Sequence, residues 1–442
     1  MAIDLVDGTR NALLLWRDSL EYLSTLGRRF PVGGTYFFGP YQSNFATGPE
    51  LVQKVLVDHA DDFHKFPMME YLRPLIGNGL LLNEDAPWRR QRKLVAPSLQ
   101  PRRVAGYATM MVDYARQTVE GWQDGAEIDL AASMMALTLR IVGKTLFDTE
   151  LSGHAGAIAN ALEVSLAFVN QRGKSLFPVP LTWPLPGNRR YRRAVAAVDG
   201  VVRAMIAERR ASGVDHGDLL SALLAARDED GQPMDDTQLR DECMTLVLAG
   251  HETTANALMW TLSLLWRHPE VRARVEREVD GALAGRAPTL DDLPRLPYTL
   301  QVLKESLRLY PPAYVMGRMA LRDLDLGEIK PRKGQFVIIS PYAMHRNPAV
   351  FADPERFDPE RFAPEAEKRL PRGAYLPFGG GPRICVGNHF ALMEAHLILA
   401  VIAQRARLDL VAGALPVPEP TVTLRPRGTV RARVSARAPA GG

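Results

Sequence analysis

The residues best suited to chemistry gather around Cys385, in a segment, 378–391, that contains four glycines and runs into an apolar helical pattern. Glycines let the backbone turn sharply and allow a flat ligand to approach it closely. Loop N–H groups and the positive end of a helix dipole beginning near Asn388 would both stabilise a thiolate. Arg383 adds a cation that could hold a carboxylate. This combination predicts a thiolate that binds a metal.

Other kinds of site compete with this interpretation. A lone cysteine beside glycines is more often an unreactive buried thiol. A phosphatase-type loop would place an arginine after the cysteine, where Val386, Gly387 and Asn388 stand instead. A zinc cluster requires about four ligands, and the chain has 2 cysteines in total. A dinucleotide loop needs a strand and an acidic residue placed around its glycines, which this segment does not have.

The pattern Phe-x-x-Gly-x-x-x-Cys-x-Gly, filled by Phe378, Gly381, Cys385 and Gly387, resembles the haem-ligand loop of the cytochrome P450 family. The resemblance implies haem b as cofactor and Cys385 as the iron ligand, with Phe378 and Gly387 beside it. It also implies a mainly α fold with small β-sheets, in which a long central helix lies over the haem and the helix carrying the Cys loop lies beneath. The chain, 1–442, would be one such domain, with the N-terminal ~20 residues and the tail 427–442 peripheral.

A helical pattern with N-cap candidates Asp236 and Thr237 continues to about His268, and roughly thirty residues would span about 45 Å. Inside it, residues 249–254 read Ala-Gly-His-Glu-Thr-Thr. A zinc-protease motif fails here because its second histidine is replaced by Ala255.

This stretch resembles the family's oxygen-activation segment. A glycine in mid-helix costs about 1 kcal/mol, so Gly250 indicates either a gap for a ligand or close packing between helices. The resemblance favours the gap, with Ala249 and Gly250 leaving room above the iron. It implies that Glu252 and Thr253 are the acid and alcohol that deliver protons.

Trp88 and Arg92 are four residues apart and would share one helical face. Alone, they would read as part of a solvated basic helix. They resemble the family's Trp-x-x-x-Arg segment, which implies that both bind a haem propionate. By the same resemblance Arg383 and Arg318 meet a propionate, although Arg322 is close enough in sequence to be an alternative to Arg318.

Glu305 and Arg308 form Glu-x-x-Arg at helical spacing, and alone they would be an ordinary surface pair. Their order before Arg361 and Cys385 resembles the family's structural brace beneath the haem. We therefore expect one carboxylate shared by two arginines.

The elements that must position these residues can be outlined. Strands and turns are expected over 29–46, a helix over 49–59, and strands over 314–318 and 336–340. Four prolines within 176–187 exclude a regular helix there and predict either the edge of a lid or a loop packed on the core. The apolar segments expected to line a substrate pocket are 64–82, 165–186 and 246–254.

Composition sets broad limits. With 442 residues, of which 46% are hydrophobic, the chain can bury a large core. A net charge of +4 is too small to predict nucleic-acid binding. The only apolar cluster near the N-terminus, 12–16, is too short to span a membrane. We expect a soluble, cytoplasmic monomer without a membrane anchor.

The predicted function is a monooxygenase that inserts one atom of O2 into a hydrophobic small molecule of the fatty acid, terpenoid, steroid or polyketide type. Residues 386–442 are too few for a reductase, so electrons should come from a separate ferredoxin or flavodoxin with its reductase. A peroxygenase is disfavoured by Glu252 and Thr253, and a haem sensor would need no proton relay. A positive surface should attract the acidic donor; its residues are Arg89, Arg90, Lys93, Arg102 and Arg103.

Overall fold

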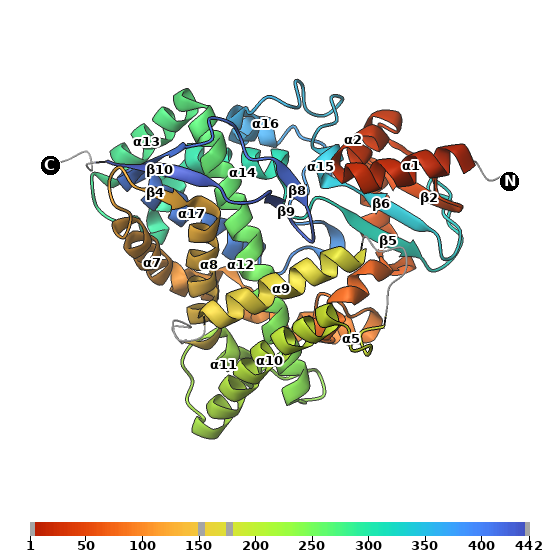
Figure 1. The fold of residues 1–442 in the computed structure, drawn as a ribbon, viewed down its shortest axis with the longest axis horizontal. Coiled ribbons are helices and arrows are strands. Elements are labelled where there is room, and N and C mark those ends of the chain that lie inside the picture. Colours follow the sequence, from red (N-terminus) through yellow and green to blue (C-terminus); the bar gives the residue numbers. More distant parts are fainter. Residues whose placement is uncertain (1–4, 149–154, 174–179, 438–442) are drawn as a thin grey trace.

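The computed structural model describes residues 5–148, 155–173 and 180–437. Helices make up most of it, and small sheets lie at either side of the view in Figure 1. The predicted fold class, mainly α with small β-sheets, is confirmed. The helices are α1 (Leu5–Arg17), α2 (Ser19–Arg29), α3 (Pro49–Gln53), α4 (Arg73–Ile76), α5 (Asp85–Val95), α6 (Pro101–Val104), α7 (Ala108–Glu120), α8 (Leu130–Phe147), α9 (Ala155–Gly173), α10 (Pro186–Ser212), α11 (Leu219–Ala225), α12 (Asp236–Arg267), α13 (Pro269–Leu283), α14 (Pro297–Leu309), α15 (Pro341–Met344), α16 (Pro364–Glu367) and α17 (Asn388–Arg405).

The largest sheet has the strand order β1-β2-β6-β5-β3, in which β2 and β6 are parallel and the other neighbours are antiparallel. The strand predicted over 314–318 starts only at Met316, because the Tyr314 carbonyl accepts the Ser340 hydroxyl instead. In the register, Lys65 lies opposite Arg318. The strands are β1 (Gly33–Phe38), β2 (Tyr41–Ala46), β3 (Phe63–Lys65), β5 (Met316–Ala320) and β6 (Phe336–Ile339), with β4 (Glu127–Asp129), β7 (Ala406–Leu410), β8 (Pro418–Pro420), β9 (Leu424–Pro426) and β10 (Arg431–Ala436) in two smaller sheets.

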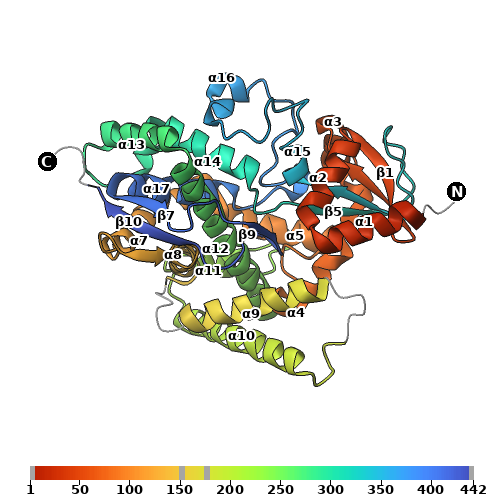
Figure 2. The same ribbon diagram turned by 45° about the horizontal axis from the view of Figure 1, so that its top comes forward.

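Helix α12 runs through the middle of the molecule and packs against α8, α10, α14 and α17 (Figure 2). The long helix predicted from the sequence is confirmed, but the predicted N-caps Asp236 and Thr237 are wrong. The cap is Asp235, whose backbone is extended and whose carboxylate accepts the N–H of Gln238. Asp236 is already helical, and its charge in the first turn favours the helix dipole.

Two hydrophobic clusters meet along α12. Its first half, through Leu248, packs with residues of α9 and α10, and its second half, from Ala255, packs with α7, α13 and α17. Among the described residues, one helix, α8, is long and apolar enough to span a membrane by length and composition, and 61% of it is buried in the fold. The two clusters together hold α12 by core packing on several sides.

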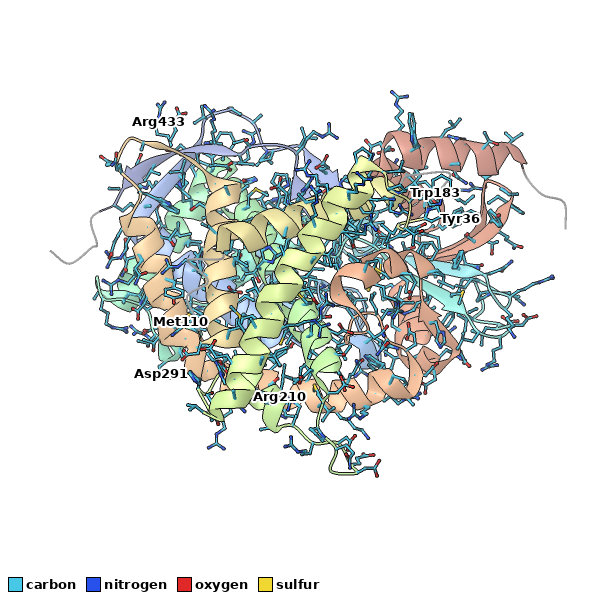
Figure 3. All side chains as sticks on the ribbon, turned by 60° about the horizontal axis from the view of Figure 1, so that its bottom comes forward. Tyr36, Met110, Trp183, Arg210, Asp291 and Arg433 are labelled. Atoms are coloured by element: carbon cyan, nitrogen blue, oxygen red, sulfur yellow. The ribbon has the colours of Figure 1, made fainter. Side chains whose placement is uncertain are left out.

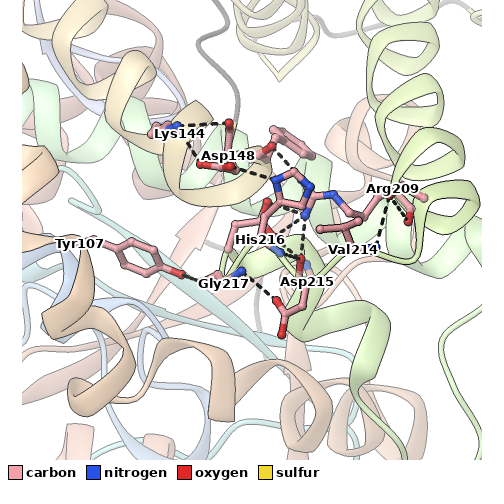
Figure 4. A network of polar contacts seen from close by, with 12 residues as sticks. Tyr107, Lys144, Asp148, Arg209, Val214, Asp215, His216 and Gly217 are labelled. Carbon is pink, nitrogen blue, oxygen red and sulfur yellow. Dashed lines mark hydrogen bonds and ion pairs between the residues drawn. The ribbon is translucent and has the colours of Figure 1, made fainter.

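A polar network ties the end of α8 to the loop between α10 and α11 (Figure 4). Asp148 contacts both Lys144 and His216. Arg209 donates to both carboxylate oxygens of Asp218 at 2.7 Å, and both side chains are buried. These contacts fix the C-terminal end of α10.

Glu394 of α17 gives the fold a specific pH dependence. Burial raises the pKa of its carboxyl from 4.5 to about 8. Between pH 4.5 and about pH 8 the folded protein keeps a proton that the unfolded chain releases. The contribution of Glu394 to the free energy of unfolding is therefore fully present below the unfolded pKa and is lost as pH rises through the folded pKa. We expect Glu394→Gln to weaken the fall in unfolding free energy over this range by a few kcal/mol. Urea denaturation at a series of pH values measures it, with the exposed Glu365→Gln as control; an unchanged slope in Glu394→Gln would contradict the assignment.

Candidate active site

The Cys385 loop is fixed by close backbone packing. The N–H of Cys385 donates to the Phe378 carbonyl at 3.0 Å, and α17 begins three residues later at Asn388. Gly381 has φ +67°, and a Cβ there would lie 1.8 Å from the Leu56 carbonyl oxygen, so only glycine fits. Protein atoms surround Cys385, yet its side chain is exposed and therefore accessible to a ligand. Burial raises the pKa of this thiol, while the Gly387 N–H and the charge of Arg92 oppose the rise.

Helix α12 carries one open face at the predicted segment. Ala249 is exposed and Leu246, Gly250 and Thr253 are partly exposed, whereas the residues around them are buried. These four positions follow the i, i+3, i+4, i+7 spacing of a single helical face. Gly250 also permits close packing, since a Cβ there would lie 3.0 Å from Val142 of α8. Both readings of this glycine thus have support in the structure.

Glu252 and Thr253 point their polar atoms to different partners. The Thr253 hydroxyl donates to the Ala249 carbonyl at 2.7 Å. Glu252 is buried, and its Oε1 accepts the hydroxyl of Thr423 at 2.7 Å. Burial raises the pKa of the Glu252 carboxyl, and the bond from Thr423 opposes this rise. Sequence reasoning missed Thr423, which lies in the turn between β8 and β9 with no motif around it.

Trp88, Arg92 and Arg383 converge beside the Cys loop. The Arg383 guanidinium lies 3.7 Å from the centre of the Trp88 ring and donates to the Asn83 carbonyl at 2.7 Å. Arg92 donates to the Ile384 carbonyl at 2.9 Å. Arg383 also forms an ion pair with a carboxylate that the sequence did not suggest, Glu84.

Arg318 belongs to the same group, and so does an unpredicted residue, Lys65. Burial, reinforced by Arg383, lowers the pKa of Arg318 to about 10 and that of Lys65 to about 7. Glu84 acts in the opposite direction on both but does not cancel the effect. Arg322, the alternative to Arg318, instead pairs with Asp62 at the surface. The register opposite Arg318 was the signal that could have revealed Lys65, but it requires knowing how the strands pair.

These features fit a haem. Several partly buried cations beside one carboxylate are unfavourable unless further anionic groups approach, and the two propionates of haem b would supply such groups. The Cys385 thiol is free and accessible, as a metal ligand must be. The residues present therefore suit a flat, dianionic, iron-containing cofactor.

The predicted brace is formed by a fully buried ion pair. Arg308 contacts Glu305 at 2.7 Å, and the side chains of both are 0% exposed. Arg361 approaches the same carboxylate at a longer distance, 3.5 Å, and donates instead to the Asp353 carbonyl. Two arginines do face one carboxylate, although only Arg308 makes short contacts with it.

The predicted pocket segments meet in part. Residues of 64–82, of α9 and of 246–254 belong to one hydrophobic cluster, which the partly buried Val422 joins from the turn between β8 and β9. Part of the proline-rich segment 176–187 lies outside the described residues. In the rest, Trp183 is 55% exposed (Figure 3), so a loop packed on the core is wrong for that part. A cleft of about 310 Å³ lies beside it, between Pro74, Leu181 and α10.

Comparison with known proteins agrees with this geometry. The family model described as Cytochrome P450 matches residues 16–430. Cyclooctat-9-en-7-ol 5-monooxygenase of Streptomyces melanosporofaciens is 39% identical, over 91% of this chain and 88% of that protein. Cyclooctatin synthase of the same organism is 40% identical over 94% and 91% of the two chains, and pentalenene oxygenase of Streptomyces avermitilis is 34% identical over 91% and 89%. The crystal structure of the cytochrome P450DA heme domain superposes with a TM-score of 0.87 at 30% identity, covering 96% and 94% of the two chains.

The match extends over nearly the whole chain and includes the Cys loop, the central helix and the brace. The chain therefore belongs to the cytochrome P450 family and is a haem-dependent monooxygenase that inserts one atom of O2 into a hydrophobic small molecule with electrons from a redox partner.

Proposed function

We propose that the substrate of this monooxygenase is a terpenoid. The observation that carries this proposal is the similarity to relatives whose names specify cyclooctat-9-en-7-ol and pentalenene as substrates. The partly buried Leu246 and Val422, which pack against the hydrophobic cluster beside the open face of α12, support it, because apolar side chains there suit an apolar molecule.

Spectral titration of the purified holoenzyme tests this proposal. Cyclooctat-9-en-7-ol, pentalenene, a steroid, a long-chain fatty acid and a macrolide would be added in turn and the spectral shift recorded for each. Each compound would then be incubated with the enzyme, NADPH and a reconstituted electron donor, and its products analysed. We expect the substrate-type shift and an oxidised product with a terpenoid. Turnover of the fatty acid or macrolide alone would overturn the proposed class, and product formation with peroxide but not with NADPH would favour the peroxygenase.

We further propose roles for the site residues. When bound, haem supplies the oxygen chemistry, with Cys385 as its thiolate ligand and Phe378 and Gly387 shaping the loop around it. Trp88, Arg92, Arg318, Arg383 and Lys65 would hold the propionates.

The distal residues have separate proposed tasks. Ala249 and Gly250 keep the middle of the open face of α12 free of large side chains, which would leave room for dioxygen and substrate. Glu252 and Thr253 would deliver protons to the site, with water as the carrier. Apolar surroundings that exclude water would strengthen the electrostatic contacts of these residues.

Arg318 offers a direct test of the propionate assignment. Arg318→Leu removes a partly buried cation, so the rate of haem transfer to a haem-scavenging protein should rise about tenfold. Arg322→Leu removes an exposed arginine four residues away and serves as the matched control. Equal transfer rates for the two variants would contradict the assignment.

The proposed electron donor is a ferredoxin or flavodoxin with its reductase, and we propose that the chain is a single-domain, cytoplasmic monomer. The predicted positive surface is weaker than the sequence implied, because Arg89, Arg90 and Lys93 are paired with Asp61, Asp228 and Glu229. Arg102 and Arg103 of α6 are exposed and form no ion pair among the described residues. They would supply most of the unpaired charge for docking.

Charge reversal tests this docking surface. In Arg102→Glu/Arg103→Glu, reduction by an acidic ferredoxin should slow by about tenfold at low salt and lose its salt dependence. Arg427→Glu/Arg431→Glu applies the same charge change near the C-terminal sheet and should leave the rate unchanged. Stopped-flow reduction measures both, and a similar loss in the two double variants would mean that only net charge matters.

A further inference from the structure

The turn between β8 and β9 reaches across the molecule to the central helix. Trp260 of α12 donates from its indole N–H to the Leu424 carbonyl at 3.1 Å, and the Leu424 N–H donates to the Pro312 carbonyl at 3.0 Å. On the other side, the Tyr314 hydroxyl donates to the Thr421 carbonyl at 2.8 Å. The turn is therefore fixed from two directions, and Thr423 between these anchors has a defined position.

Thr423 links two residues that share one face of α12. Asn256 Nδ2 donates to the Thr423 hydroxyl at 3.1 Å, and that hydroxyl donates to Glu252 Oε1 at 2.7 Å. All three side chains are buried, with 4%, 7% and 3% of their surfaces exposed respectively. Because an amide NH2 can only donate, it occupies a lone pair of the hydroxyl and leaves the hydroxyl proton for the carboxylate. Asn256 thus sets the direction of the hydrogen bonds that run from Asn256 through Thr423 to Glu252.

This arrangement matters because Glu252 is expected to both give and accept protons. A buried carboxyl resists ionisation, whereas a hydrogen bond donated to its charged form favours ionisation. Burial raises the pKa of the Glu252 carboxyl, and the bond from Thr423, followed by the charge of Arg425, limits the rise. A relay works best when neither protonation state is strongly disfavoured.

We propose that Thr423 is a positioning residue that holds Glu252 in the orientation and protonation balance from which it passes protons inward. This inference rests on the proposed relay role of Glu252 and Thr253. The alternative is that the bond only satisfies a buried carboxyl and that its loss would affect stability alone.

A role of Thr423 in proton delivery should change how electrons are divided between product and hydrogen peroxide. The reaction RH + O2 + 2 H⁺ + 2 e⁻ → ROH + H2O consumes two protons per turnover, with electrons from the redox partner. When oxygen is reduced without insertion, O2 + 2 H⁺ + 2 e⁻ → H2O2 uses the same electrons. Misplaced proton delivery should therefore divert electrons from product to peroxide.

The test compares Thr423→Val, which removes the hydroxyl at constant shape, with Thr423→Ser, which keeps it. The infrared carboxyl band of Glu252, identified by its absence in Glu252→Gln, reports its ionisation in the holoenzyme without turnover. In Thr423→Val the pH midpoint of this band should rise, product formation per NADPH should fall about tenfold and substrate Kd should stay within about twofold. Thr423→Ser should restore both readouts. Thr261→Val, at a buried threonine of α12 that does not contact Glu252, is the matched control.

Each other outcome is informative. An unchanged midpoint and unchanged coupling in Thr423→Val would overturn the inference, as would a Ser variant as impaired as the Val variant. If Thr423→Val does not fold, Asn256→Ala, which removes the donor that orients the hydroxyl, should shift the midpoint in the same direction, and no shift would again overturn it. If Glu252→Gln itself leaves coupling normal, the proposed relay fails; if only Thr423→Val does, the relay stands and the role of Thr423 fails.

Discussion

Cys385→Ser should abolish the thiolate-type spectrum of the ferrous carbon monoxide complex and lower NADPH-driven turnover by at least about a thousandfold, or ~4 kcal/mol in activation free energy. The reason is electronic. A thiolate donates electron density that favours O–O cleavage, and a serine hydroxyl does not. The loop itself should survive, because the Cys385 N–H bond to Phe378 and the fit of Gly381 against Leu56 do not involve the sulfur.

Cys243 provides the matched control, since it is the other cysteine of the chain. It is fully buried in α12, and burial raises the pKa of its thiol far above the ordinary value. Cys243→Ser should keep the thiolate spectrum and lose about 1–3 kcal/mol of stability through a buried hydroxyl. A thiolate spectrum in Cys385→Ser, or its loss in a folded Cys243→Ser, would contradict the assigned ligand.

The sequence was sufficient to predict those parts of the site whose residues lie close together in the chain. The Cys loop could be predicted because its motif is confined to a few residues, among which Gly381 must be glycine for the backbone to pass Leu56. The central helix could be predicted because its apolar pattern runs unbroken to Pro269. The contact between Glu305 and Arg308 follows from helical spacing, whereas their role in the brace was predicted from their order before Arg361 and Cys385.

Parts of the site that depend on distant pairing could not be predicted. Thr423 reaches Glu252 across 171 positions of sequence, and its turn carries no motif. Lys65 joins the cation group only because β3 pairs with β5, which places it opposite Arg318. The cap Asp235 was missed for a different reason: three acceptable cap residues follow one another, and only the backbone decides among them.

Arg308→Met should destabilise the protein by about 3–5 kcal/mol, because it leaves the Glu305 carboxylate buried without its main partner. Arg308 also donates to the His345 and Pro354 carbonyls at 2.7 Å each, so the variant leaves these acceptors unpaired as well. The longer contact from Arg361, at 3.5 Å, is too weak to replace it. Urea denaturation of the holoenzyme, followed by haem absorbance and circular dichroism, measures the loss.

A control must distinguish the effect of the buried Glu305–Arg308 ion pair on stability from that of an exposed ion pair. Arg28→Met breaks the contact of Arg28 with Glu21, whose side chains are 66% and 50% exposed, and should change stability by less than about 1 kcal/mol. Glu305→Leu/Arg308→Met removes both buried charges and should be less destabilised than the sum of its single variants, since neither charge remains unpaired. If the double variant is as unstable as that sum, the two residues act independently, and the brace would owe its stability to the carbonyl bonds of Arg308 rather than to the shared carboxylate.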